Sequence, residues 1–231
     1  TGQQNTAVGF EALTFNTSGS NTAVGAFSLY ASTTSYYTTA VGTSALRANT
    51  TGNYNVAVGS MALRSNTTAS NLTAVGHEAL YSNTTGTDNI AVGYKALYTN
   101  TTGYSNQAFG PNTLLSNTTG YSNIALGNAA LHSNTTGHSN AAIGEYVLYV
   151  NTTGLANTGM GEETLRYNTT GSHNTALGRR SLYANTTGTQ NASVGGLGAN
   201  TTGGHNTAMG VGTLSANTTG TANTAVGNNA M

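Results

Sequence analysis

An apolar residue followed by glycine recurs along the whole chain at an almost constant interval. Eleven of the thirteen intervals are 17 residues, and the other two are 16 and 15. A short fixed period is the signature of a solenoid, in which each repeat packs only on its neighbours. The sequence therefore predicts a single repeat array over residues 1–231, a fragment of a longer fibrous protein with both ends in mid-repeat. The apolar residues are Val8, Val24, Val41, Val58, Val75, Val92, Phe109, Leu126, Ile143, Met160, Leu177, Val194, Met209 and Val226.

Numbered from the asparagine of Asn-Thr-Ala-Val-Gly, the repeat reads N-T-A-V-G-x-x-A-L-x-x-N-T-T-G-x-x. Position 5 is glycine in all fourteen coils, including Gly9, Gly93 and Gly178, and position 15 is glycine in twelve of fourteen. An invariant glycine indicates a corner where φ is positive or another backbone lies close. The T-A-V and A-L-x-x segments between the corners suggest two short strands per coil. Helices are disfavoured, because each interior glycine would cost a helix about 1 kcal/mol. We therefore expect an all-β fold, a parallel β-solenoid of about fourteen 17-residue coils.

Each coil offers only two dependable large apolar residues for a core, at positions 4 and 9, for example Val92 and Leu97. So thin a core is marginal for a single chain, which favours an oligomer. Position 3 is alanine in twelve of fourteen coils. These alanines would suit the close approach of a partner chain, and the alternative is that they point into a narrow coil.

Stacked coils place each residue over the residue 17 positions later, about 4.8 Å away. Opposite charges in such pairs are favourable. Three pairs fit this expectation, whereas Glu145 and Glu162 form one pair of like charge. The three pairs are Glu78 with Lys95, Glu162 with Arg179, and Glu163 with Arg180.

Position 12 is asparagine in twelve of the thirteen coils that reach it, for example Asn49, Asn83 and Asn134, and position 13 is always threonine. Asn-Thr-Thr is an N-glycosylation sequon. Glycans on adjacent coils about 4.8 Å apart would collide, however. We therefore favour a ladder of amide side chains, each hydrogen-bonded to the asparagines of the neighbouring coils.

The N-T-A-V-G-x-x-A-L motif resembles the N-S-V-A-I-G-x-x-A type repeats of YadA-like heads in trimeric autotransporter adhesins. It is also similar to repeats of bacteriophage tail fibres, and the resemblance covers essentially the whole chain. It implies a left-handed parallel β-roll in which three chains pack side by side about a long axis. The repeat is longer than in those heads because of an inserted Asn-Thr-Thr-Gly corner, and this departure concerns the chain packing more than the roll.

The composition contains little that points to chemistry. Six basic and six acidic residues give a net charge of zero, so no basic face is available for nucleic acid. There is no cysteine, and no apolar run approaches the roughly 18 residues of a membrane span. The five histidines form neither a pair nor a column, and no nucleophile motif or phosphate loop is present. We expect no enzyme activity, catalytic residue, metal or cofactor, and no insertion of this segment into a membrane.

Position 10 carries mostly planar side chains along ten successive coils. A planar stripe can stack on sugar rings or on groups of a host surface. The alternative is that these side chains lie over a neighbouring coil or chain. The candidate binding residues are Tyr30, Tyr81, Tyr98, Tyr149 and Tyr183, and the stripe also holds Arg47, Arg64, Leu115, His132 and Arg166.

The sequence thus suggests a structural shaft or head of an extracellular fibre, on a cell surface or a virion, that provides reach, rigidity and surface attachment. Such a chain would be a homotrimer, with a host surface or a glycan as its ligand. An alternative is a subunit that polymerises end to end into an extracellular filament. Ice binding is a weaker alternative, because the threonine columns at positions 13 and 14 are adjacent and should face opposite sides of a strand.

Overall fold

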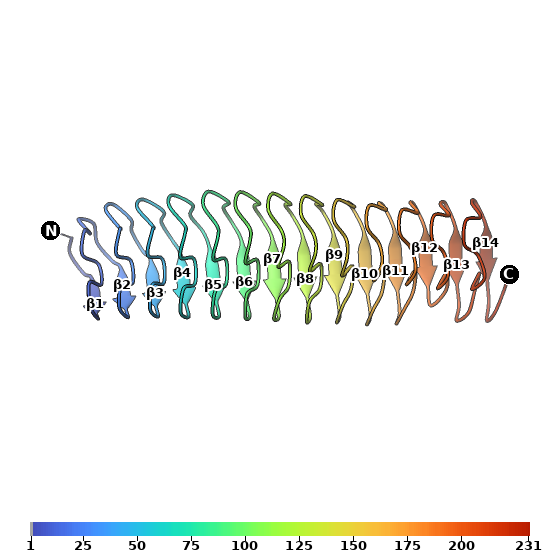
Figure 1. Cartoon of the computed structure of the whole chain (residues 1–231), viewed down its shortest axis with the longest axis horizontal. Coiled ribbons are helices and arrows are strands. Elements are labelled where there is room, and N and C mark those ends of the chain that lie inside the picture. Colours follow the sequence, from blue (N-terminus) through green and yellow to red (C-terminus); the bar gives the residue numbers. More distant parts are fainter. Residues whose placement is uncertain (1) are drawn as a thin grey trace. The chain divides into compact units, whose positions relative to one another are not determined.

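The computed structural model describes residues 2–231, in which all regular secondary structure is β-strand. The chain divides into two compact units, Thr1–Thr119 and Gly120–Met231, each built from seven strands. Every strand has three residues and contributes one rung of a parallel β-solenoid, which confirms the predicted fold class. Figure 1 shows the strand of each coil beside the strand of the next within each unit.

The strands coincide with positions 2 to 4 of the repeat. Those of the first unit are β1 (Thr6–Val8), β2 (Thr22–Val24), β3 (Thr39–Val41), β4 (Val56–Val58), β5 (Thr73–Val75), β6 (Ile90–Val92) and β7 (Gln107–Phe109). Those of the second unit are β8 (Ile124–Leu126), β9 (Ala141–Ile143), β10 (Thr158–Met160), β11 (Thr175–Leu177), β12 (Ala192–Val194), β13 (Thr207–Met209) and β14 (Thr224–Val226).

Within each unit the strands pair in chain order, and equivalent residues face each other across the pairs. In the first unit Ala91 of β6 is in register with Ala108 of β7, and in the second Ala142 of β9 is in register with Gly159 of β10. The two irregular intervals leave this register intact, since Ala7 pairs with Ala23 and Ser193 with Ala208. A coil thus absorbs a deletion without displacing its strand.

The middle residue of each strand faces inward, and its two neighbours face outward, as the alternation of a strand requires. Ala91 is fully buried, whereas Ile90 and Val92 on either side are half-buried. The prediction that Val92 and the other position-4 residues form the core is therefore wrong. Position 3 fills the interior instead, so the expectation that its alanines approach a partner chain is wrong too. Only a small side chain fits there, because the coil is narrow.

The predicted second strand, A-L-x-x, is a turn. Positive φ recurs at alternate residues here, with Lys95, just before the segment, at 54° and Leu97 within it at 53°, and positive φ is incompatible with a strand of L-residues. The amide of Leu97 donates to the Thr113 carbonyl of the next coil at 3.0 Å. The amide of Lys95 donates to the His77 carbonyl of the preceding coil at 3.0 Å. This irregular segment therefore bonds to the coils on both sides, much as a strand would.

Leucine at position 9 supplies the large core side chain of every coil but the last, where Met231 is exposed, and Leu97 is fully buried as predicted. The shortened coil between Val194 and Met209 retains the buried position-9 leucine. Its deletion removes positions 6 and 7, yet Leu197 still has a φ of 55° and is fully buried between Gly196 and Gly198. The two glycines stand at positions 8 and 10, where their carbonyls accept from Leu182 and Ala184 of the preceding coil.

The two glycine columns have different causes. Gly93 has a φ of 140°, and a Cβ on it would lie 2.5 Å from the Gly110 carbonyl oxygen of the next coil. The other position-5 glycines share the positive φ, including Gly9 at 133° and Gly178 at 99°, which confirms the predicted corner. At position 15 the limit is space, because a Cβ on Gly86 would lie 2.1 Å from the carbonyl oxygen of Gly103.

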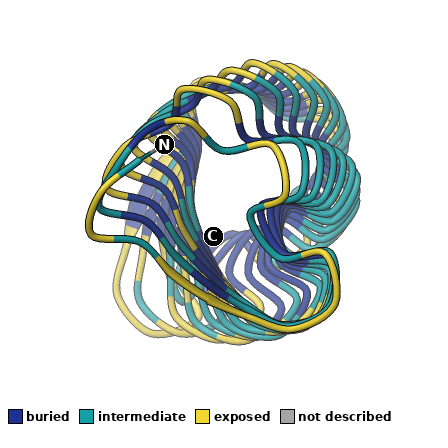
Figure 2. Cartoon of the chain, turned by 90° about the vertical axis from the view of Figure 1, so that its left-hand side faces the viewer, coloured by how far each residue is buried: buried dark blue, intermediate teal, exposed yellow. Residues whose placement is uncertain are grey.

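Asparagine side chains form the predicted ladder inside the coils. The Asn83 amide nitrogen donates to Asn66 Oδ1 at 3.2 Å and to the Gly86 carbonyl of its own coil at 3.0 Å. Asn49 and Asn134 take part in the same way and are fully buried, like Asn83. Bands of equal burial therefore run from coil to coil within each unit, as Figure 2 shows.

A second ladder, at position 1, was not predicted. Asn106 donates from its backbone amide and its side chain to Asn89 Oδ1, at 2.9 and 3.2 Å. The two ladders meet at position 15, where the Gly103 carbonyl accepts from Asn89 at 2.7 Å and from Asn100 at 2.9 Å. The interior of each coil is thus half apolar and half a satisfied amide network, which resists distortion because an unpaired buried amide is costly.

Candidate functional site

The outer face of the strands, formed by positions 2 and 4, is uncharged and open to solvent. Position 4 is a large apolar residue in every coil, whereas position 2 is threonine or glutamine in nine of the fourteen. Val58 is 37% exposed in the first unit, and Leu126 is 47% exposed in the second. The face follows from the buried alanine between these positions, since alternation turns both neighbours outward. Positions 2 and 4 of all coils together form the strand face.

No charged residue occupies the strand face in any coil. All twelve charged residues of the chain stand at positions 6, 7, 10 and 17. The position-4 column is a continuous row of large apolar side chains that the single chain leaves unburied, and an apolar row of this kind favours an interaction site. The absence of charge excludes a partner that is recognised by charge pairing on this face.

The Asn-Thr-Thr corner has no free asparagine for glycan attachment. Asn49, Asn83 and Asn134 are fully buried, and their side-chain amides are engaged in the ladder. The glycosylation reading of this column is therefore wrong for the folded chain. The threonine that follows is engaged as well: Thr50 donates from its amide and its hydroxyl to the Thr67 carbonyl, at 2.8 and 3.0 Å. The position-13 hydroxyls are therefore not directed at solvent, whereas the position-14 threonines, such as Thr68, are exposed.

All three predicted charge pairs are present. Lys95 Nζ lies 3.5 Å from Glu78 Oε2, and Arg179 Nε lies 3.2 Å from Glu162 Oε2. Glu163 is the most engaged carboxylate, because Arg180 donates to it at 2.5 Å and Arg166 pairs with it as well. The hydrogen bond from Arg180, aided by the nearby charge, holds the pKa of Glu163 below its usual value.

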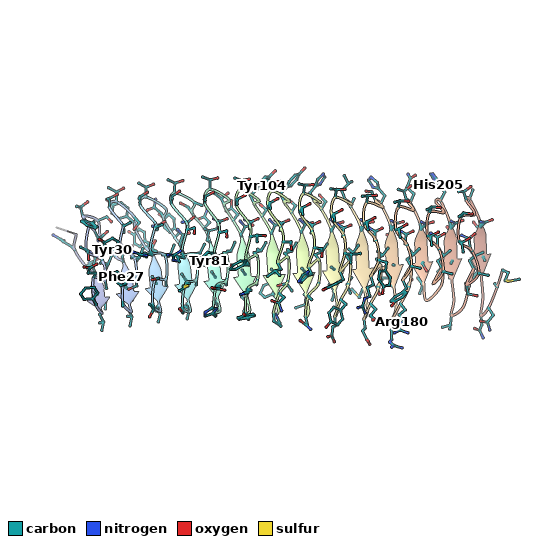
Figure 3. The ribbon with its side chains drawn as sticks, in the orientation of Figure 1. Phe27, Tyr30, Tyr81, Tyr104, Arg180 and His205 are labelled. Carbon is teal, nitrogen blue, oxygen red and sulfur yellow. The ribbon has the colours of Figure 1, made fainter. Side chains whose placement is uncertain are left out.

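The position-10 stripe lies over neighbouring coils in the first unit. Tyr81 stacks on Tyr98 with ring centroids 5.2 Å apart, and Arg64 donates to the Tyr81 hydroxyl at 2.7 Å. Tyr30 meets Phe15 edge to face at 5.1 Å. Figure 3 shows Tyr30 and Tyr81 at the same level of their coils. The tyrosines are half-buried, so each keeps an accessible part of its ring.

The second unit continues the pattern with more ion pairing. His132 stacks on Tyr149 at 4.9 Å, and burial lowers the pKa of this histidine. Arg166 lies 5.8 Å from the Tyr149 ring, and Arg180 lies 5.3 Å from the Tyr183 ring. Each of the five candidate tyrosines thus contacts another aromatic ring or a cationic side chain. These contacts fit the alternative that the stripe covers neighbouring coils, and they also hold its rings in fixed positions.

A surface groove of about 370 Å³ follows the stripe across the coils that contain β2, β3 and β4. Its lining consists of positions 10 and 11 of these coils: Tyr30, Ala31, Arg47, Ala48, Arg64 and Ser65. The small position-11 residues leave room between the larger position-10 side chains. Sequence reasoning named the stripe but missed this groove, although three small residues in succession at position 11 are a signal for it.

Other kinds of site find little support in the described part of the chain. Residues 2–231 contain no cluster of three or more His, Cys, Asp or Glu side chains placed to hold a metal ion. Within the same range there is no helix with the length and apolar character that crossing a bilayer requires.

The strand face and the stripe with its groove are therefore the two candidate functional surfaces. Comparison of the chain with protein-family models, with curated proteins and with solved structures finds no match.

Proposed function

We propose that this chain is a structural shaft or head segment of an extracellular fibre, such as an adhesin or a phage tail fibre. Three copies pack side by side through the strand face, and the fibre provides reach, rigidity and surface attachment. The observation that carries the proposal is the strand face itself: it is free of charge, it presents a large apolar side chain at position 4 of every coil, and none of its residues is buried in the single chain.

Rigidity is supported by the way each coil bonds to its neighbours. The strands, the turn after position 5 and the threonine at position 13 all make hydrogen bonds from coil to coil. Two asparagine ladders add side-chain bonds in the interior, for example from Asn100 to Asn83 at 2.9 Å. Bending a coil out of register would break several of these bonds together, and their groups are buried.

Association of copies is supported by the thinness of the core. One leucine and a few alanines per coil bury little apolar surface for a chain of this size. The strand face adds two residues per coil to the buried surface once a partner covers it. A second copy of the same chain is the partner that fits, because its strand face has the same repeat and also lacks charge. The number three comes from the resemblance to trimeric adhesin heads.

Sedimentation equilibrium tests this proposal. The wild-type chain should sediment at three times its 23.3 kDa mass. Replacing Val58 and Val92 together by aspartate would place charges on the strand face of each copy and should yield monomers. The matched control replaces Thr68 and Thr102, which are exposed at position 14, by aspartate and should leave the trimer intact.

Circular dichroism should show that both double variants keep the β-sheet signal. A wild-type monomer at tens of micromolar would contradict the proposal. An open series of growing masses would instead favour the end-to-end filament, and dissociation of the control as readily as the Val58/Val92 variant would show that the strand face is not the contact.

A further inference from the structure

Two of the six cationic side chains in the chain have no acidic partner among the described residues 2–231. Lys95, Arg166, Arg179 and Arg180 each pair with a glutamate. The remaining two, Arg47 and Arg64, are neighbours in the position-10 stripe, one coil apart. In a chain with so few charges, two adjacent cations without an acidic partner in one groove are an exception.

Backbone bonds fix the stacking of these two arginines. Ala31 N–H donates to the Arg47 carbonyl at 3.0 Å, and Ala48 N–H donates to the Arg64 carbonyl at 3.1 Å. Successive coils bring the two side-chain origins about 4.8 Å apart. Arg47 lies over rings of the preceding coil and Arg64 over the Tyr81 ring of the following one, so the two positive charges flank the groove from its two sides and would both attract a bound anion.

The side chains are also held in place by aromatic rings. The Arg47 guanidinium lies 5.2 Å from the Phe27 ring centroid and 5.9 Å from that of Tyr30. Arg64 is tied to the Tyr81 hydroxyl at 2.7 Å. A guanidinium stacked on a ring keeps its N–H edge available for a carboxylate or sulfate, which it binds in a forked geometry. The groove is thus a preformed pair of anion donors beside a tyrosine ring.

We infer that this groove binds an acidic sugar residue, with its carboxylate or sulfate between Arg47 and Arg64 and its ring against Tyr30. The volume of about 370 Å³ suits one or two sugar rings and is near the lower limit of small-molecule pockets. Two cations on a neutral chain are too few for nucleic acid, whose binding depends on many phosphate contacts. The inference does not depend on the proposed function, because a single chain supplies the whole groove.

Isothermal titration of the full chain with oligogalacturonate, oligomeric dextran sulfate and neutral maltoheptaose tests the inference. One acidic oligosaccharide or both should bind, and the comparison between them separates carboxylate from sulfate. Maltoheptaose should not bind. The variant with Arg47→Gln and Arg64→Gln should weaken binding at least tenfold, and 0.5 M salt should weaken it in the wild type, because salt screens exposed charges.

The matched control is Arg179→Gln with Arg180→Gln, which also removes two positive charges, but from glutamate-paired sites, and should leave the affinity unchanged. A second variant, Ala48→Phe, fills the groove without altering its charge and should abolish binding even if the arginine variant folds poorly. The inference is overturned if no acidic oligosaccharide binds, if the double glutamine variant binds normally, or if inorganic sulfate or duplex DNA binds as tightly as the oligosaccharides.

Discussion

At the scale of single residues, the repeat depends on backbone conformations that L-residues rarely adopt. The position-9 leucines have φ values near 50°, for example 53° at Leu97. Such a conformation costs roughly 1 to 2 kcal/mol per residue, and full burial of leucine returns about 1.5 to 3 kcal/mol. Leucine rather than glycine therefore occupies this turn because the coil interior has no other large apolar side chain.

The position-5 glycine is the residue whose substitution we expect to be most damaging. Gly93→Ala combines a φ of 140° with a Cβ 2.5 Å from the Gly110 carbonyl oxygen, so the coil must both strain and separate. We expect a loss of about 2 to 4 kcal/mol of unfolding free energy per chain, measured by urea denaturation. Gly198→Ala is the matched control, because a Cβ there meets nothing within 4 Å, and its effect should be small. Equal midpoints for Gly93→Ala and the wild type would show that the corner is not strained.

The ion pairs of Glu163 predict a dependence of stability on pH. Arg180 lowers the pKa of this carboxyl below 4.5, so the ion pair contributes fully above pH 4.5 and its contribution is lost as the pH falls through the folded-state pKa. The melting temperature of the wild type should exceed that of Glu163→Gln at pH 7, and the difference should shrink below pH 4.5. Glu162→Gln, at a more exposed pair, should show a smaller difference at pH 7. A gap between wild type and Glu163→Gln that stays constant down to pH 3 would contradict this assignment.

At the scale of the coil, part of the structure could be predicted from the sequence, for identifiable reasons. The period fixed the stacking, so the pairs Glu78–Lys95 and Glu163–Arg180 and the amide contacts of Asn83 could be foreseen. Which face of each strand points into the coil could not be predicted. Ala91 and Val92 are both apolar, and alternation alone does not say which of the two faces inward. Only the narrowness of the coil decides that the smaller side chain is inside.

The turns and the groove were beyond sequence reasoning for a different reason. A segment such as Ala96-Leu97 has the composition of a strand, and its alternating φ becomes visible only in the structure. The second amide ladder depends on the position-1 side chain facing the coil interior, which the repeat alone does not reveal. The groove needs both the small size of Ala48 and the side-chain positions of Arg47 and Arg64, and the sequence supplies only the first.

The ladders predict that a buried asparagine is worth more than its size suggests. Asn66→Ala removes donors to Asn49 Oδ1 at 2.8 Å and to the Ala69 carbonyl at 3.0 Å, and it takes away an acceptor of Asn83. Leaving such buried groups unpaired should cost about 3 kcal/mol, measured as a shift of the urea midpoint. Thr68→Ala, two residues on and exposed, should shift it little. An Asn66→Ala variant as stable as this control would mean that the ladder does not stabilise the coil.

At the scale of the whole molecule, we propose that copies pack in parallel and in register through the strand face. Equivalent coils of different copies then lie at the same level, and each position-2 residue lies near its own counterpart. The chain has no cysteine, so a single introduced cysteine carries a spin label at one defined place. Thr73, Ile90 and Gln107 are three successive position-2 residues on the strand face of the first unit.

The most direct test is the distance between labels in different copies, measured by pulsed electron paramagnetic resonance for Thr73→Cys, Ile90→Cys and Gln107→Cys separately. If copies pack in parallel and in register, the distance between labels in different copies should be short and the same at all three positions. In an antiparallel assembly the axial offset would instead change by about 10 Å from one label to the next, since each coil contributes about 4.8 Å on both copies. Such a change, or no coupling between labels at all, would contradict the side-by-side fibre.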